Sequence, residues 1–351
     1  MKTRALLFFC LSFIFLACDD EIDVFSDDPN LPVVYGVLNS KDSVHYVRIT
    51  RTFRGEGNNL EYAKIPDSSY TQITNVKLEA LSGSSVRATY TGNMVELAPK
   101  KEGDFFTEPN FAYEFQIPEL DKYSEYRLSF DHAGNEVMAQ ATIPSKPSFV
   151  NVATFSVVNN DITTGNQPFY GNLIFDYNTA SKGKLYLLSF VFRYTEFYQD
   201  GSSEEKELVM DLSEFPSQNI SGGDKIRYRL NGLSFLSRLA ALIKPDPNVK
   251  SRLVGNGTVI LTSVAEELFI YQQATSGTGG VSQSNLNYTN VYIDNGETGL
   301  GIFEGASTIE ATRDFSNFSV KAIIFSEQTA GLKFCTDRQS ILSDNPSAAC
   351  D

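Results

Sequence analysis

The 351-residue sequence contains no tryptophan and only two histidines, His45 and His132. Without tryptophan, the Cys–Trp–Cys core of antibody domains is excluded. The histidines are far apart and no H-E-x-x-H or C-x-x-C spacing occurs, so we expect no metal site and two histidines that are exposed or half-buried. The chain also lacks a G-x-x-x-x-G-K-[ST] phosphate loop and a G-x-S-x-G nucleophile elbow, although a Ser–His–Asp triad could use either histidine. We therefore predict no cofactor and no identifiable catalytic residue.

Positive charge is also scarce, because 29 lysines and arginines stand against 43 aspartates and glutamates, which gives a formal net charge of −14. Such a surface repels the phosphates of nucleic acids, so we expect no nucleic-acid partner. The same acidic balance keeps a protein soluble whatever its function. Carboxylate pairs are too numerous to single one out as catalytic, and a surface glycan hydrolase that uses such a pair stays open as an alternative.

The first residues of the chain form a short apolar segment. Ala5 to Ala17 are apolar or small and follow Lys2 and Arg4. As a helix they would span about 20 Å, which is too short for the roughly 30 Å hydrocarbon core of a bilayer. This anatomy predicts a signal peptide over residues 1–17. The ending Phe-Leu-Ala-Cys resembles a bacterial lipobox, which implies that Cys18 is lipidated and becomes the mature N-terminus. An ordinary secreted protein is the alternative.

The remaining cysteines form a pair near the C-terminus. Cys10 lies within the predicted signal peptide, and Cys18 is the predicted lipid attachment site, which leaves Cys335 and Cys350. Exported proteins fold in an oxidising compartment, so we predict a disulfide between these two. It would close a loop of about fifteen residues, worth about 3 kcal/mol in the chain-entropy model. Two free thiols are the alternative.

Residues 18–30 contain six acids and few large apolar side chains, which predicts a tether too polar to pack. The acids Asp19, Asp20 and Glu21, directly after Cys18, resemble the surface-export signal of Bacteroidota lipoproteins. This resemblance implies a protein that is lipid-anchored in the outer membrane and faces the cell exterior. A solvated spacer is the alternative.

Residues 31–146 predict an antiparallel β-sandwich that is immunoglobulin-like in architecture only. Short β-rich segments are separated by turn residues at intervals of roughly 8–12 positions. In one segment Val47 and Ile49 alternate with Arg48 and Thr50, the pattern of a strand with one buried face. The expected strands cover residues 31–38, 44–53, 76–81, 86–90, 94–97, 111–117, 126–130 and 136–143, with a hairpin turn at 133–135.

The best domain boundary is Pro144 to Pro147, because two prolines hold the backbone extended and remove hydrogen-bond donors. Residues 147–351 predict a second β-rich domain with short helices and the C-terminal disulfide loop. Its strongest strand, residues 185–198, is apolar on both faces and is expected to be central and covered on both sides. An aromatic platform for a ligand is the alternative. Other expected strands are residues 173–177, 259–261 and 320–325.

Two short helices are expected in this second domain. Residues 233–243 carry apolar side chains at helical spacing, and Pro245 ends the pattern. The second helix is expected to begin at Ser263, where Ser263 and Glu266 have the S-x-x-E spacing of a capping box. Both helices are expected to cover the end of a sheet.

The stretch Val291–Ala306 contains the pattern N-G…G-L-G-I-F-x-G. It resembles the DUF4249 family of Bacteroidota outer-membrane lipoproteins. Residues 33–38 with 46–52 resemble the opening strand pair of that family, and residues 126–144 resemble its mid-chain hairpin. The family implies no known activity. Its members resemble accessory lipoproteins encoded near TonB-dependent outer-membrane transporters, so the resemblance implies a transporter or another outer-membrane barrel as partner.

The glycines of this stretch do not indicate a nucleotide site. Gly299, Gly301 and Gly305 lack the G-x-G-x-x-G spacing, and no strand–turn–helix unit follows them. We expect them to serve turns and close backbone approach instead.

Two further positions carry weaker hypotheses. Asp294, Asn295 and Glu297 offer oxygen ligands for calcium but lack EF-hand spacing. Asp42-Ser43-Val44 resembles the short acceptor for O-glycosylation in Bacteroidota, with Ser43 accessible in a predicted turn. An ordinary Asp–Ser turn is the alternative.

The leading functional hypothesis is a non-enzymatic, lipid-anchored surface protein that docks on an outer-membrane barrel or presents a ligand to it. The glycan hydrolase named above is the second hypothesis, and a structural, adhesin-like module is the third.

Overall fold

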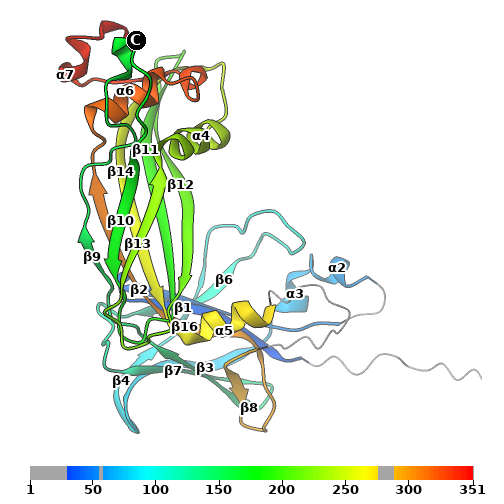
Figure 1. Cartoon of the computed structure of the whole chain (residues 1–351). Coiled ribbons are helices and arrows are strands. Elements are labelled where there is room, and N and C mark those ends of the chain that lie inside the picture. Colours follow the sequence, from blue (N-terminus) through cyan, green and yellow to red (C-terminus); the bar gives the residue numbers. More distant parts are fainter. Residues whose placement is uncertain (1–29, 55–57, 276–287, 351) are drawn as a thin grey trace, which may run out of the picture.

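The computed structural model describes residues 30–54, 58–275 and 288–350. Strands make up 48% of the chain and helices 16%, so the protein is mostly β, as the sequence predicts. The predicted signal peptide, Cys18 and residues 18–29 of the predicted tether lie outside the described residues. Figure 1 shows an elongated molecule with a lower β-sandwich, an upper layer of long strands above it, and helices at the upper end.

The described strands form three sheets. The main sheet has the order β12-β11-β14-β16-β1-β2-β6-β5, and β17 pairs with β14 beside it. A five-stranded sheet has the order β15-β8-β7-β3-β4, and a three-stranded sheet has the order β13-β10-β9. The strands of the main sheet are β1 (Pro32–Asn39), β2 (Val44–Arg51), β5 (Asn93–Glu96), β6 (Phe111–Gln116), β11 (Leu185–Tyr198), β12 (Ser203–Pro216), β14 (Val249–Val264), β16 (Leu300–Arg313) and β17 (Phe334–Cys335). The others are β3 (Ile73–Ser82), β4 (Ser85–Thr91), β7 (Glu125–His132), β8 (Asn135–Thr142), β9 (Ser148–Asn151), β10 (Asn172–Asn178), β13 (Lys225–Asn231) and β15 (Val291–Ile293).

The helices of the described ranges are mostly short. They are α2 (Asn59–Tyr62), α3 (Pro66–Ser69), α4 (Gly232–Leu242), α5 (Glu266–Thr275), α6 (Asn317–Phe325) and α7 (Gln339–Leu342), with 3-10 turns at Ile162–Thr164, Ala330–Leu332 and Pro346–Ala348. Within these ranges, none of the helices has both the length and the apolar character needed to cross a membrane.

The lower sandwich packs the five-stranded sheet against the β1, β2 and β6 part of the main sheet. Its core contains Val34, Val47, Phe115 and Leu128, all of which are fully buried. Every second residue of β1 and β2 points into this core, because successive side chains of a strand lie on opposite faces. The other face of these two strands is therefore available for a site.

The upper half has a second core that is rich in aromatic rings. Phe155, Phe175, Phe190, Phe235 and Phe315 are all buried, and the rings of Phe155 and Phe190 lie 5.0 Å apart in an edge-to-face arrangement. Such pairs add about 0.5–1.5 kcal/mol beyond area burial. Helices α4 and α6 lie at the upper end of the long strands (Figure 1).

Strand β16 joins the two halves. Residues 300–306 pair in parallel with β1, and residues 306–313 pair with β14. Hydrogen bonding of the main sheet therefore continues across the boundary that the sequence suggests near residue 146. The two cores divide near the same place, since Ile143 belongs to the lower core and Val152 to the upper. The division into domains 31–146 and 147–351 stays a prediction.

Several strand predictions are confirmed. In β2, Val47 and Ile49 are buried while Arg48 and Thr50 lie on the other face. Strand β11 covers residues 185–198 and lies between β12 and β14. Tyr186, Phe190 and Phe192, the aromatic residues on which the platform alternative depended, are fully buried, so they offer no surface to a ligand.

The strand predicted at residues 320–325 is wrong, because this segment belongs to helix α6. The side chain of Ser316 caps the helix by accepting a hydrogen bond from the Ser319 backbone. Val320 to Ile324 are all buried, including Lys321, which pairs with Asp161 at 2.5 Å. A helical segment with five consecutive buried residues shows no polar face, so its sequence resembles a buried strand.

The predicted start of the second helix is also wrong. Ser263 lies in β14, opposite Tyr186 of β11 and Ser307 of β16, and α5 begins at Glu266. The expected short strand at 259–261 is part of the 16-residue β14. Because β14 pairs with β11 on one side and with β16 on the other up to Val264, Ser263 is held in the strand and does not cap a helix. The first helix prediction, residues 233–243, is confirmed by α4.

Candidate functional site

A pocket of about 520 Å³ lies over the outward face of β1 and β2. We call it the aromatic–cationic pocket and define it by Tyr35, Arg48, Lys100, Phe53 and Phe105. In the antiparallel register Tyr35 lies opposite Arg48. Alternation places both side chains on the face that turns away from the lower core, so the strand pair itself supplies the floor.

The walls come from two loops. One loop follows β2 and carries Phe53 and, after α3, Tyr70; the other connects β5 to β6 and carries Phe105 and Phe106. The rings of Phe53 and Phe105 lie 6.4 Å apart, and those of Tyr70 and Phe106 lie 5.5 Å apart, both edge-to-face. The Tyr70 hydroxyl accepts a hydrogen bond from the backbone of Phe111 at 3.0 Å. Ring contacts therefore connect the two loops.

Arg48 is held in place by Asn110, the residue before β6. Its Nη2 donates to Oδ1 of Asn110 at 2.6 Å, and the amide of Asn110 donates in turn to the backbone oxygen of Ala98 at 2.6 Å. Its Nε is buried and has no hydrogen-bond acceptor in the described part of the chain. A guanidinium keeps its charge at any physiological pH, and an unmet buried donor costs free energy. A negatively charged ligand would compensate this charge.

Lys100 extends from the other side of the pocket. Its ammonium lies 3.5 Å from the centre of the Phe106 ring, a cation–π contact. Burial lowers the pKa of Lys100, and the positive charge of Arg48 lowers it further. Two positive charges thus face the same space, one from a strand and one from a loop. Each disfavours the charged form of the other, and an anion between them would offset this repulsion.

Tyr35 connects the pocket to helix α5. Its hydroxyl lies 3.3 Å from the hydroxyl of Tyr271. Burial and this hydrogen bond raise the pKa of Tyr35 to about 12, so the phenol stays protonated and can donate. The rim of the pocket is therefore in contact with α5, which is more than 200 positions away in the sequence.

The charged side chains that line this pocket in the described ranges are of one sign. Among the described residues that line it, Arg48, Arg51 and Lys100 are cationic and none is acidic. Within the described ranges, neither Arg48 nor Lys100 forms an ion pair with a carboxylate. In a protein of net charge −14, such a local excess of positive charge is suited to anion binding.

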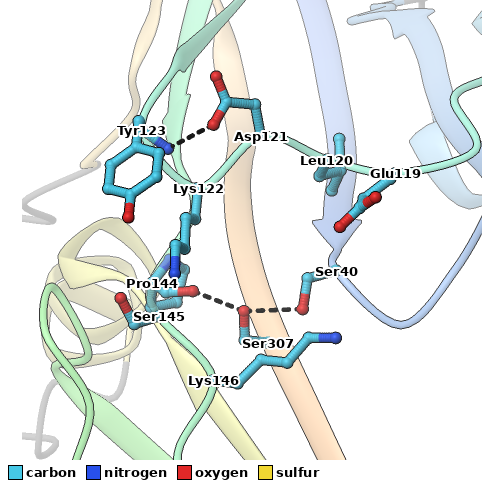
Figure 2. A pocket seen from close by; sticks show the side chains of 10 residues that line it. All are labelled: Ser40, Glu119, Leu120, Asp121, Lys122, Tyr123, Pro144, Ser145, Lys146 and Ser307. Atoms are coloured by element: carbon cyan, nitrogen blue, oxygen red, sulfur yellow. Dashed lines mark hydrogen bonds between the residues drawn. The ribbon is translucent and has the colours of Figure 1, made fainter.

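A second hollow, of about 610 Å³, lies between the end of β1, the loop from β6 to β7, and the segment after β8 (Figure 2). We call it the junction hollow. Ser307 of β16 donates to the backbone oxygen of Pro144 at 2.5 Å and accepts from Ser40 at 2.9 Å. These hydroxyls are thus engaged with each other and with the backbone, and no base is hydrogen-bonded to either of them among the described residues.

The junction hollow has charges of both signs. It is lined by Glu119 and Asp121 and by Lys122 and Lys146. Asp121 accepts hydrogen bonds from the Tyr123 backbone and the Ser124 hydroxyl, which lower its pKa. Because Asp121 is held as a carboxylate, it is unsuited to donate a proton. Opposite charges offset one another here, which makes the junction hollow the weaker candidate for a charged ligand.

The cysteine pair predicted near the C-terminus is at bonding distance. The Sγ atoms of Cys335 and Cys350 are 2.06 Å apart, and their Cα atoms are 5.0 Å apart. The pair lies at the upper end of the molecule, where the chain ends (Figure 1). Ser43 is exposed in the bend before β2, so it is accessible, and its glycosylation stays a prediction. The lipidation of Cys18 concerns a residue outside the described ranges.

The expectation that both histidines are exposed or half-buried is wrong. His45 and His132 are 2% and 4% exposed. Burial lowers the pKa of His45, and Nε2 of His132 lies 2.8 Å from the backbone oxygen of Asn30. His45 belongs to β2 and His132 to β7, which lie in different sheets of the lower sandwich. Both side chains are therefore part of the packing of this sandwich.

The other candidate residues have structural roles. Asn295 and Glu297 hydrogen bond to each other within the turn after β15. In the described ranges, no cluster of three or more His, Cys, Asp or Glu is arranged to hold a metal ion. The expected close approach of the glycines is confirmed, since a Cβ on Gly301, at φ +88°, would lie 2.0 Å from the Val34 oxygen.

Sequence reasoning placed Arg48 and Thr50 on the outward face of a strand but did not connect them with Lys100, Phe105 or Phe106. The only available signal was a pair of phenylalanines in a polar loop next to two lysines. These residues come together because two loops fold back over β1 and β2. The conformation of a loop cannot be predicted from the spacing of apolar residues.

Comparison with known proteins adds little. No protein-family model and no curated protein matches the chain. Among solved structures, the C-terminal globular domain of an oligosaccharyltransferase from Pyrococcus abyssi matches at 10% identity and a TM-score of 0.17, over 57% of this chain and 39% of that one. A BSP domain of a biofilm-associated protein matches at 8% identity and a TM-score of 0.14, over 80% of this chain and 58% of that one. The chain thus spans less than two thirds of either neighbour, and the likeness is too low to carry an argument.

Proposed function

We propose that this protein is a lipid-anchored, surface-exposed accessory protein of the outer membrane, of the DUF4249 type, that binds a small ligand and presents it to a barrel partner such as a TonB-dependent transporter. The signal anatomy before Cys18 and the acids after it support the address. The glycine-rich stretch around residues 291–306 supports the family.

The aromatic–cationic pocket is the observation that carries the binding role. Arg48 is suited to holding a ligand and poorly suited to acid–base chemistry, since arginine does not exchange its proton near neutral pH. Its walls are tied by ring contacts and by the Arg48–Asn110 hydrogen bond, so the site is largely formed before a ligand arrives. Preformed, mostly apolar concavities with a few polar groups are typical of ligand sites.

The position of the pocket in the chain fits presentation at a membrane. Its floor begins at Val33, fifteen residues after Cys18. Fifteen extended residues span at most about 50 Å. A lipid on Cys18 would thus hold the pocket within about 50 Å of the bilayer, which is within reach of the outer loops of a membrane protein.

The test is isolation of the native protein in a gentle detergent, followed by identification of what accompanies it. We expect an outer-membrane barrel to co-purify, and intact-mass analysis to show acyl chains on Cys18 as the N-terminal residue. A protein without acyl chains, or one that elutes alone after mild cross-linking, would contradict the proposal.

The same preparation separates the other hypotheses. Cleavage of a polysaccharide that is lost in Glu119→Gln would favour a hydrolase that uses the junction hollow. Binding to host matrix without a barrel partner would favour an adhesin.

A further inference from the structure

We propose that the aromatic–cationic pocket binds a small organic anion, with the negative head between Arg48 and Lys100 and a flat apolar body against the phenylalanine rings. The inference rests on the proposed binding role and names the chemical class of the ligand.

The case for a negative head begins with the two cations. Arg48 and Lys100 face one space, and neither has a carboxylate partner in the described ranges. Other cations of this protein do have such partners, for example Arg227 with Asp176 at 2.6 Å and Arg127 with Glu79 at 2.7 Å. Two partly buried positive charges without counter-charge are costly, and a shared anion offsets the cost for both.

The geometry of Arg48 adds direction to this argument. Asn110 already accepts from Nη2, which restrains the guanidinium, while the buried Nε lacks an acceptor among the described residues. A planar cation with remaining donors recognises a carboxylate or a sulfonate better than a spherical halide. The head group is therefore an oxyanion.

The case for an apolar body comes from the rings. Phe105 is 54% exposed, although a large apolar side chain normally gains by burial. It is supported edge-to-face by Phe53, so it presents its surface at the mouth of the pocket. The Tyr70 hydroxyl already bonds to the backbone of Pro109 and Phe111, so this ring contributes mainly its apolar surface. An aromatic or alicyclic body fits this lining.

Calorimetric titration of the purified, detergent-solubilised protein tests the proposal. The probes are naphthalene-2-carboxylate, naphthalene-2-sulfonate and the neutral 2-naphthamide, each corrected by a titration into detergent alone. We expect saturable binding of one equivalent of an anionic probe, and at least about ten-fold weaker binding of the amide, since charge-assisted hydrogen bonds are lost. The two anionic probes distinguish carboxylate from sulfonate recognition.

Matched variants locate the binding. Lys100→Met is expected to weaken the anionic probe about ten-fold, whereas Lys101→Met, at the exposed neighbouring position, leaves it unchanged. Arg48→Gln should act like Lys100→Met, provided that its thermal unfolding matches the parent. Phe105→Gln alters an exposed ring, so it is expected to fold, and it should weaken charged and neutral probes equally.

The proposal is overturned if no anionic probe saturates, if 2-naphthamide binds as tightly as the carboxylate, or if Lys100→Met and Lys101→Met behave alike. These outcomes differ from failure of the proposed function. If the protein binds the probe but no barrel co-purifies, the ligand proposal stands and the partner proposal fails. If a barrel co-purifies but no probe binds, the partner proposal stands and the ligand proposal fails.

Discussion

Two buried charged groups, Arg252 in the upper half of the molecule and Glu304 in the lower half, differ in how they are compensated. In the upper half Arg252, which is 1% exposed, pairs with Glu196 at 2.8 Å and donates to the backbone oxygen of Leu332 at 2.7 Å. In the lower half, Glu304 is 1% exposed and accepts a hydrogen bond from the Leu268 backbone, and burial raises its pKa to about 8. Paired charges resist change, whereas charges without counter-charge respond to ligands and to pH.

Other features also differ between the two ends of the long axis. The upper half has the interlocked phenylalanine core and the bonded cysteine pair, features that fix a structure. In the lower half, Arg48 and Lys100 have no carboxylate partner among the described residues, and burial raises the pKa of Glu304, on the strand that pairs with β1. We therefore expect substitutions in the upper half to change stability and those in the lower half to change binding and pH response.

The largest effect is expected from Arg252→Met. Removal of the guanidinium leaves Glu196 buried without its partner, and breaking such a pair typically costs about 3–5 kcal/mol. Denaturant unfolding should show this loss of stability, while Arg229→Met, an exposed arginine of β13, should stay near the parent. The double variant with Glu196→Leu should recover part of the loss. If Arg252→Met is as stable as Arg229→Met, the ion pair does not support the upper half.

The cysteine pair should come next. Replacing both Cys335 and Cys350 by serine opens a loop of fifteen residues, a change worth about 3 kcal/mol in the chain-entropy model. The loop is also held by the Thr336 backbone, which donates to Ala348 at 2.8 Å, so the fold should persist with a lower midpoint. The same decrease should follow when the parent is reduced. Unchanged unfolding in both experiments would mean that the disulfide does not stabilise the upper half.

A smaller, pH-dependent effect is expected from Glu304→Gln. Because the folded-state pKa of about 8 exceeds the ordinary value of 4.5, the folded protein holds a proton that the unfolded chain releases. This contribution to stability is complete below pH 4.5 and is lost as the pH rises through about 8. The parent should lose about 2 kcal/mol between pH 6 and pH 8, an order-of-magnitude figure.

The amide in Glu304→Gln removes this titration and keeps an acceptor for the Leu268 backbone, so its stability should vary less over the same pH range. Glu310→Gln, on the exposed end of the same strand, is the matched control and should follow the parent. Equal pH profiles for all three proteins would show that Glu304 is ionised in the folded state.

Most of the fold could be predicted from the sequence because its strands alternate. The burial pattern of β2 follows from Val47 and Ile49, and the hairpin between β7 and β8 follows from the left-handed Ala133 and Gly134. Prediction failed where surroundings decide the conformation. Residues 320–325 carry β-branched side chains that fit a strand, yet the capped segment forms a helix whose middle, residues 319–324, is buried.

The candidate site could be predicted only in part. Alternation alone places Arg48 on the outward face of its strand, but 52 positions separate it from Lys100. Their approach depends on loop conformation and on the buried Asn110, which gives no periodic signal. Nor does the sequence show that Glu304, in a glycine-rich stretch, is buried beneath the first turn of α5, since that follows from the pairing of β16 with both halves.

The smallest effect is expected from Tyr35→Phe, which removes the hydroxyl contact between the pocket rim and Tyr271 of α5. The side chain is 46% exposed, so the hydrogen bond should add at most about 1 kcal/mol to global stability. Its local effect should be measurable, because amide hydrogen exchange of residues 268–274 reports opening of α5 itself. We expect faster exchange there in Tyr35→Phe but not in Tyr46→Phe, which alters a similarly exposed tyrosine of β2. If binding of the anionic probe slows exchange in residues 268–274 of the parent, the pocket and α5 are coupled through this contact. If Tyr35→Phe changes neither the exchange rate nor the effect of the probe on it, the pocket responds to an anion without α5.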